Sequence, residues 1–65
     1  MTIQLNGDGY QTSAATITSL VEELNLNGQP VLIEKNGAAL FPREFETTAL
    51  SEGDEIELIR VVAGG

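Results

Sequence analysis

A chain of 65 residues has room for one domain with a small core, and 42% hydrophobic residues are enough to build that core. The chain has no cysteine and no histidine, which excludes disulfide bonds, a Cys/His zinc site and catalysis by either residue. Ten acidic residues against three basic ones give a formal charge of −7, so a basic protein surface is a better partner than a phosphate backbone or an anionic lipid.

The start of the chain, residues 1–6, has no basic segment followed by an apolar run, and it predicts no signal peptide. No apolar stretch approaches the roughly 20 residues of a membrane span. We therefore expect a cytoplasmic protein that binds neither nucleic acid nor membranes.

The chain is predicted to open with a β-hairpin. Residues 2–6 alternate between apolar and polar, with Ile3 and Leu5 on the inner side. Residues 6–9, Asn-Gly-Asp-Gly, form a dense turn signal, because Asn and Gly tolerate positive φ. Residues 10–12 then predict a short returning strand.

A helix follows the hairpin. Its apolar side chains recur at i, i+3, i+4 and i+7 and form one stripe, consisting of Ile17, Leu20, Val21 and Leu24. Thr16 is placed to cap the first turn, and either Asn25 or Gly28 can supply the left-handed residue that ends the helix. The opposite side is predicted to be a solvated face and carries Glu22 and Glu23.

The second half of the chain predicts three more strands. Residues 31–35 form a clear one, and residues 38–41 form a weaker one that Pro42 limits to a short or edge position. Residues 43–50 show no sustained period and are expected to form a loop with a helical turn. The longest strand is predicted at residues 55–62.

The alternation in that last strand predicts which of its side chains face the helix and which face the open side of the sheet. It places two side chains against the helix, those of Ile56 and Leu58. Ile59 and Val61 then point to the open face, and Leu32 joins them there if its neighbours face the helix. A sheet covered on one side is normally polar on the other. These three residues are therefore either isolated exposed apolar residues, which are common on protein surfaces, or a contiguous docking patch. We predict a partner-docking patch at Leu32, Ile59 and Val61.

The element order β-β-α-β-β-β, with one helix packed across one face of a sheet, predicts a two-layer α+β domain. No linker, repeat or low-complexity segment divides the chain. Residues 1–65 are therefore expected to form a single domain.

The acidic residues do not predict an enzyme. Four of them gather around the last turn: Glu52, Asp54, Glu55 and Glu57. Their spacing misses that of a calcium loop, and so small a domain has little room for the cleft that separates the pKa values of an acid/base pair. We interpret the four as a solvated turn and strand edge, with recognition of a basic partner as the functional alternative. No metal site and no catalytic residue are predicted.

The chain ends in Ala63, Gly64 and Gly65. Glycine has no Cβ, so such an end can enter a channel too narrow for a side chain. The terminal carboxylate is expected to be exposed and mobile, because these residues cannot pack. Taken alone, the segment is either a frayed end or a carboxylate that another protein works on.

Several ordered motifs cover essentially the whole chain: Asn6-Gly7, residues 31–37 (Val-Leu-Ile-Glu-Lys-Asn-Gly), residues 41–45 (Phe-Pro-Arg-Glu-Phe), Thr48-x-Leu50-x-x-Gly53-Asp54 and Gly64-Gly65. In this order they resemble the ThiS family, the small sulfur carrier proteins of thiamine biosynthesis. Each motif alone is weak, but the ordered set that ends on a bare Gly-Gly is specific. Lys35 departs from the family, which often has an apolar residue there, so the end of that strand is expected to be less buried.

The resemblance implies a ubiquitin-like β-grasp fold, in which a mixed sheet has its first and last strands adjacent, central and parallel. One helix would pack on one face, and residues 63–65 would form a flexible tail. The resemblance also implies a carrier rather than an enzyme. An E1-like adenylyltransferase (ThiF) would activate the Gly65 carboxylate with ATP and Mg²⁺, and a persulfide donor would convert it to a thiocarboxylate. The sulfur would then pass to thiazole synthase (ThiG), and this chain itself would bind no cofactor.

Two other interpretations stay open. The small subunit of molybdopterin synthase shares the fold, the Gly-Gly end and the thiocarboxylate chemistry, but it is typically longer and often carries a Pro-Pro segment that this chain lacks. A ubiquitin-like modifier or interaction module would instead be joined to lysines through Gly65, or would bind through the patch alone.

Overall fold

Five strands and one α-helix follow one another in the predicted order within residues 1–62, the part of the chain that the computed structural model describes. The elements are β1 (Thr2–Leu5), β2 (Asp8–Gln11), α1 (Ile17–Glu23), β3 (Val31–Lys35), β4 (Ala38–Leu40), the 3-10 turn η1 (Pro42–Glu44) and β5 (Glu55–Arg60).

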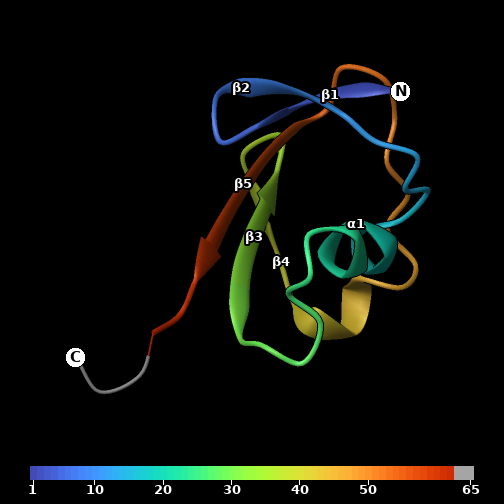
Figure 1. The fold of residues 1–65 in the computed structure, drawn as a ribbon. Helices are drawn as coiled ribbons and strands as arrows, with labels where there is room; N and C mark the ends of the chain where they lie inside the picture. The colour runs from blue at the N-terminus through green and yellow to red at the C-terminus, as the bar shows by residue number, and fades with distance from the viewer. Residues whose placement is uncertain (63–65) are drawn as a thin grey trace.

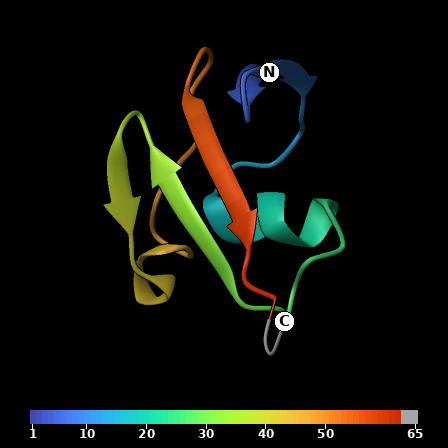
Figure 2. The ribbon, with the colours of Figure 1, turned by 90° about the vertical axis from the view of Figure 1, so that its left-hand side faces the viewer.

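The sheet is mixed and has the strand order β2-β1-β5-β3-β4. β1 and β5 run parallel, whereas the other neighbouring pairs are antiparallel. α1 lies across one face of the sheet (Figure 1), and Figure 2 shows β5 between β3 and the N-terminal hairpin with α1 behind it. This arrangement confirms the predicted α+β class and the β-grasp fold, including the parallel pairing of the first and last strands that the resemblance implies.

The two ends of α1 are set by local hydrogen bonds. Thr16 caps the first turn as predicted, because its Oγ1 accepts from the Ser19 amide at 3.2 Å. Of the two candidates for the left-handed residue, Asn25 ends the helix, with φ at 60°. The Leu26 amide then donates back to the Val21 carbonyl at 2.9 Å, which completes a Schellman motif and turns Leu26 toward the core.

The core lies between α1 and the centre of the sheet. Its buried residues are Ile3, Ala14, Ile17, Leu20, Val21, Val31, Ile33, Leu50, Ile56 and Leu58. The most deeply buried of them come from β1, α1 and β5, where Ile3, Ile17, Leu20 and Ile56 have less than 2% of their surface exposed. The apolar periods of the sequence therefore predicted the inward faces of these three elements correctly.

Two Asn-Gly turns hold β5 from both sides. Asn6 and Asn36, with φ of 52° and 51°, join β1 to β2 and β3 to β4, and each points its side chain at β5. The Asn6 carboxamide accepts from the Leu58 amide at 2.7 Å and donates to the Leu58 carbonyl at 3.1 Å. It thus bonds as a backbone peptide group would, and it extends the β1–β5 pairing beyond the last paired residues, Leu5 and Ile56.

Asn36 makes the corresponding contact on the β3 side. Its Oδ1 accepts from the Glu55 amide at 2.8 Å, and its Nδ2 donates to Asp54 Oδ1 at 3.1 Å. The Asn36 amide also donates to the Glu55 carbonyl at 2.8 Å. The start of β5 is therefore positioned by side chains as well as by the strand ladder.

Asp54 is buried, so the prediction that the whole acidic group is solvated is wrong for this residue; the other three members, Glu52, Glu55 and Glu57, are exposed. Only 9% of Asp54 is exposed, because its carboxylate accepts from Asn36 and, through Oδ2, from the Ser51 amide at 2.8 Å. Lys35 Nζ lies 3.8 Å from the same oxygen. These contacts replace water around the carboxylate, which is the condition for burying it.

Lys35 agrees with the expectation that the end of this strand is less buried. It is half-buried at the end of β3, and its Nζ also donates to the Ala49 carbonyl at 3.0 Å. The long side chain thereby joins β3 to the loop that precedes β5.

Replacing Asn6 by Asp tests its contact with β5. The carboxylate keeps the shape of the side chain but cannot donate to the Leu58 carbonyl, so two acceptors would face each other. We expect the free energy of unfolding in urea to fall by about 1–3 kcal/mol. Asn27→Asp makes the same charge change on an exposed side chain and should alter stability by less than about 0.5 kcal/mol. Equal losses in the two variants would assign the effect to charge alone.

The environment of Asp54 predicts a loss of stability in acid. Burial raises the pKa of Asp54, but hydrogen bonds from Asn36 and the Ser51 amide, together with the Lys35 ammonium, bring that pKa below its usual value. A carboxylate whose pKa is lower in the folded state contributes stability above its unfolded pKa, and the contribution is lost as the pH falls through the folded pKa. Asp54→Asn should therefore lower the free energy of unfolding at neutral pH, with the difference from the parent protein shrinking toward about pH 2. A difference that does not depend on pH would instead assign the loss to hydrogen-bond geometry.

Candidate functional site

The predicted reactive end, Ala63, Gly64 and Gly65, lies outside the described residues, and the assignment of Gly65 as the adenylation and thiocarboxylate site stays a prediction. The structure does describe the chain that leads to it. After β5 the Val61 amide donates to the Pro30 carbonyl at 3.0 Å, which ties the start of this segment to the residue before β3. The segment therefore leaves the domain at a defined place beside the 27–30 loop (Figures 1 and 2).

The three residues of the predicted docking patch are exposed on the open face of the sheet. Leu32 is 62% exposed, Ile59 is 61% exposed and Val61 is 44% exposed. Leu32 and Ile59 are directly paired across β3 and β5, so their side chains lie next to each other on the face that α1 leaves open. The pairing confirms the side of the sheet for Leu32 and Ile59. Val61 is exposed just after β5, and the docking role of all three stays a prediction.

Phe41 extends this apolar surface, although its exposure was not predicted from the sequence. The β3–β4 pairing matches Ile33 with Leu40, and Phe41 is still extended, with φ at −83° and ψ at 150°. The alternation therefore continues for one more residue and places Phe41 on the open face beside Leu32. Phe41 is 60% exposed, and the Arg43 guanidinium lies over its ring at 4.8 Å from the centroid. Leu40 is partly buried, which agrees with the outward direction of Phe41, but a strand of three residues is too short for its alternation to be read from the sequence.

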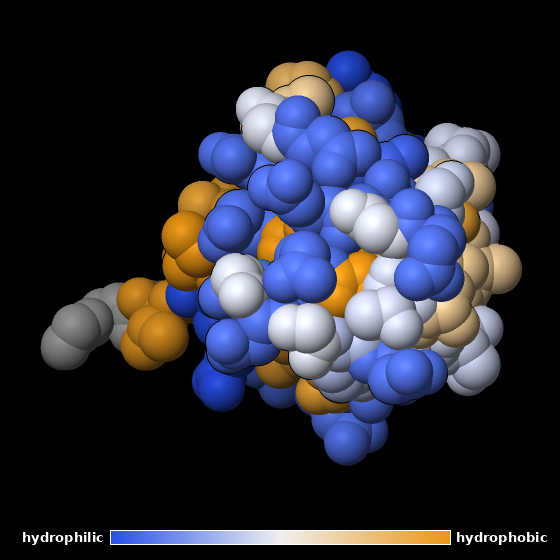
Figure 3. All heavy atoms as spheres, turned by 90° about the horizontal axis from the view of Figure 1, so that it is seen from above, coloured by the Kyte–Doolittle hydropathy of each residue, from blue (hydrophilic) through white to orange (hydrophobic). Residues whose placement is uncertain are grey.

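We call Leu32, Phe41, Ile59 and Val61 the open-face patch. Val62, which follows it, is 75% exposed. Figure 3 shows hydrophobic side chains gathered on the side of the molecule from which the C-terminal segment leaves. Contiguous exposed apolar side chains of this kind are a common feature of interaction surfaces.

An acidic pair borders the open-face patch. Glu34 and Glu57 are directly opposite each other on β3 and β5, and both are exposed. Like charges in this arrangement oppose strand pairing. The pair lies two residues, or about 7 Å, along the strands from Leu32 and Ile59. The open face therefore offers an apolar group and two carboxylates within the reach of one partner element.

A second polar cluster ties the N-terminal hairpin to α1. Glu23 accepts from the Tyr10 hydroxyl at 2.7 Å and from the Thr12 hydroxyl at 2.9 Å. These hydrogen bonds lower the pKa of Glu23, and the bond to Glu23 raises the pKa of Tyr10. Glu22 and Glu23 are both exposed as predicted, but the role of Glu23 in holding the hairpin was not foreseen.

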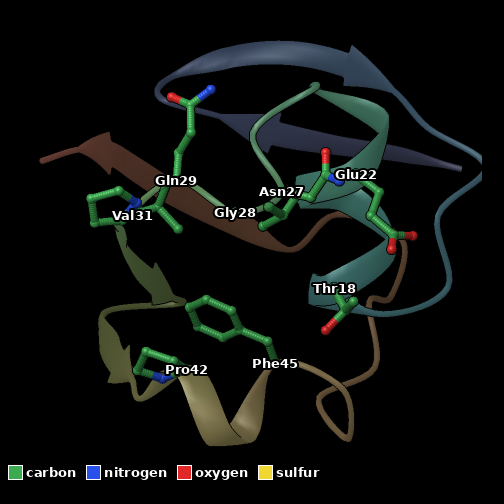
Figure 4. A pocket seen from close by; sticks show the side chains of 10 residues that line it. Thr18, Glu22, Asn27, Gly28, Gln29, Val31, Pro42 and Phe45 are labelled. Atoms are coloured by element: carbon green, nitrogen blue, oxygen red, sulfur yellow. The ribbon is translucent and has the colours of Figure 1, made fainter.

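An apolar groove of about 500 Å³ lies on the opposite, helix-covered side of the molecule. Its apolar lining residues are Val21, Pro30, Val31, Pro42 and Phe45, and its polar ones include Thr18, Glu22, Asn27 and Gln29. Figure 4 shows most of these side chains. This groove could not be predicted from the sequence, because it forms between α1, the 27–30 loop and η1. Among its described lining residues Glu22 is the one carboxylate, so no acid/base pair is assembled there.

Within residues 1–62 no three side chains of the types that hold metals come together as a candidate ion site. No helix in that part of the chain has the length and apolar character needed to cross a membrane.

Comparisons with known proteins agree with the fold. The model of the ThiS family matches residues 3–65. The crystal structure of the thiamine biosynthesis protein ThiS from Geobacter metallireducens superimposes with a TM-score of 0.82 at 28% identity, and both chains are fully covered.

Two relatives extend this comparison. The uncharacterized protein ycf40 of Porphyra purpurea is 32% identical over 66 residues, which cover all of this chain and 93% of that protein. A thiazole synthase of Paramagnetospirillum magneticum is 27% identical over 66 residues, but the match covers only 20% of its length.

Proposed function

Because the chain belongs to the ThiS family, we propose that it is a sulfur carrier of thiamine biosynthesis. The observation that carries this proposal is the family match, which continues through residue 65 and so includes the terminal Gly64-Gly65. In this role the chain is a co-substrate of partner enzymes and has no catalytic residue of its own.

The proposed chemistry takes place at Gly65. A carboxylate is a poor electrophile, so an E1-like adenylyltransferase (ThiF) uses ATP and Mg²⁺ to join it to AMP with release of pyrophosphate. The terminal sulfur of a persulfide donor then attacks the carbonyl carbon, and AMP leaves. A thiol cleaves the resulting sulfur–sulfur bond, which leaves a thiocarboxylate on Gly65. The chain has no cysteine, so the sulfur comes from another molecule.

The folded domain positions the C-terminal segment relative to the partner enzyme. The open-face patch lies on β3, the end of β4 and β5, and β5 is fixed by the side chains of Asn6 and Asn36. The C-terminal segment starts at the Val61–Pro30 hydrogen bond, at the edge of the same surface. A partner that binds the patch therefore receives the end of the chain from a fixed origin, which reduces the entropy lost in aligning the carboxylate for reaction.

The partner surface proposed for this site is apolar with basic residues beside it. An apolar side chain would cover Leu32 and Ile59, while Lys or Arg would lie against Glu34 and Glu57. We propose that the adenylyltransferase and thiazole synthase (ThiG) use this surface in turn. The resemblance of part of a thiazole synthase to this chain supports thiazole synthase as the acceptor of the sulfur.

The family match favours the thiazole pathway over a molybdopterin-synthase-like carrier or a ubiquitin-like modifier. All three would present Gly65 to an activating enzyme, but their products differ. A carrier gains one sulfur in place of one oxygen, whereas a modifier forms conjugates of much higher mass.

Removal of Gly65 tests the proposed reaction site. The deletion lies outside the described core, so cooperative unfolding should be unchanged. Intact-mass measurement after incubation with the adenylyltransferase, ATP, Mg²⁺ and a persulfide source should show the replacement of oxygen by sulfur in the full chain and none in the truncated one. A sulfur gain that survives the deletion would refute Gly65 as the site, and high-mass conjugates of the full chain would support the modifier.

Ile59→Glu tests the open-face patch. It puts a charge at the centre of the apolar group, and we expect binding to the adenylyltransferase to weaken by at least about tenfold. The loss of stability should stay within about 1 kcal/mol, because Ile59 is exposed and loses mainly its cross-strand contact with Leu32. Gln29→Glu adds the same charge on the groove side and is the matched control. Equal weakening by both variants, measured by calorimetry, would show that net charge and not the patch determines binding.

A further inference from the structure

The chain contains three Asn-Gly pairs: Asn6-Gly7, Asn27-Gly28 and Asn36-Gly37. In such a pair the main-chain nitrogen of glycine can attack the Asn side-chain carbonyl, because no Cβ obstructs its approach. The attack forms a succinimide and releases ammonia. All three pairs have the same local chemistry, so differences between them in the folded protein come from the structure around each side chain.

Two of the pairs are held by β5. The Asn6 carboxamide is bound at both ends by the main chain of Leu58, at 2.7 and 3.1 Å. The Asn36 carboxamide is bound by the Glu55 amide at 2.8 Å and by Asp54 at 3.1 Å. At these two positions, turning the carboxamide toward the next main-chain nitrogen breaks both hydrogen bonds.

The third pair lies in the loop between α1 and β3. Asn27 is exposed, and no described residue forms a hydrogen bond with its side chain. Its turn is closed by the Gln29 amide, which donates to the Leu26 carbonyl at 3.0 Å, and this bond leaves the carboxamide of Asn27 uninvolved. The space beside the glycine Cα is open at all three pairs, with nothing within 4 Å of where a Cβ would stand, so the state of the Asn side chain is what distinguishes them. Figure 4 shows Asn27 and Gly28 together in this loop at the rim of the groove.

We propose that Asn27 is a deamidation site of the folded protein and that the fold protects Asn6 and Asn36. The Gly28 nitrogen loses its proton and bonds to Asn27 Cγ, while the Cγ–Nδ2 bond breaks and ammonia carries the proton away. Water then opens the succinimide at either carbonyl and yields aspartate or isoaspartate. One water enters and one ammonia leaves, with no oxidation or reduction.

The reaction changes the loop that supports the C-terminal segment. Either product replaces a neutral side chain by a carboxylate, so the formal charge of −7 becomes −8. Isoaspartate also adds a methylene group to the main chain three residues before Pro30, whose carbonyl binds the Val61 amide. The strands and the open-face patch keep their covalent structure. The inference does not depend on the proposed carrier function.

Peptide mapping by mass spectrometry, with detection of isoaspartate, tests this proposal on the full chain. After incubation at mildly alkaline pH in native buffer, we expect modification at Asn27 to be at least about tenfold faster than at Asn6 or Asn36. In concentrated urea the three rates should converge, because the protecting hydrogen bonds are gone. Asn27→Gln should remove the fast native-state product.

Two results would overturn the proposal. One is native-state modification of Asn6 or Asn36 that is as fast as that of Asn27. The other is an Asn27 rate in native buffer that is no higher than the slow rates at Asn6 and Asn36. The exposed loop would then protect the Asn27 carboxamide to the same degree as the hydrogen bonds to β5 protect the other two. Circular dichroism of the incubated protein shows that the sample remained folded during the measurement.

Discussion

The position of β5 is the constraint on which the rest of the molecule depends. This strand pairs with β1 on one side and β3 on the other, buries Ile56 and Leu58 against α1, and exposes Ile59 on the open face. A single strand thus joins the core to the surface proposed for docking and continues into the C-terminal segment. Any displacement of β5 would move all three together, which explains why side chains from both hairpin turns hold it in addition to the ladder.

Most of the fold could be predicted because its signals are local. The apolar stripe from Ile17 to Leu24 and the alternation in β1, β3 and β5 depend on residues close in the sequence, and the structure agrees with each of them. The parallel pairing of β1 with β5 has no local signal and came from the resemblance to a family. The burial of Asp54 was missed for a similar reason, because Asn36, one of its partners, is 18 residues away.

The candidate site likewise has parts that could be predicted from local sequence and parts that could not. Strand alternation predicted the exposure of Leu32 and Ile59, but β4 is only three residues long and was too short to show that Phe41 joins them. The groove between α1 and η1 depends on how a loop and a 3-10 turn pack together, and neither has a periodic sequence. The chemistry of Gly65 rests on the family resemblance, since glycine has no side chain from which a role could be derived.

The two Asn residues that hold β5 illustrate how one position can satisfy two unrelated conditions. Each must tolerate a positive φ within a tight turn, and each must offer one donor and one acceptor at the distance of a peptide group. Glycine meets the first condition and not the second, whereas aspartate has the acceptor but lacks the donor. Glutamine has both groups but is one methylene longer. Among the twenty amino acids, asparagine alone fulfils both conditions, so these two turns leave sequence variation no equivalent substitute.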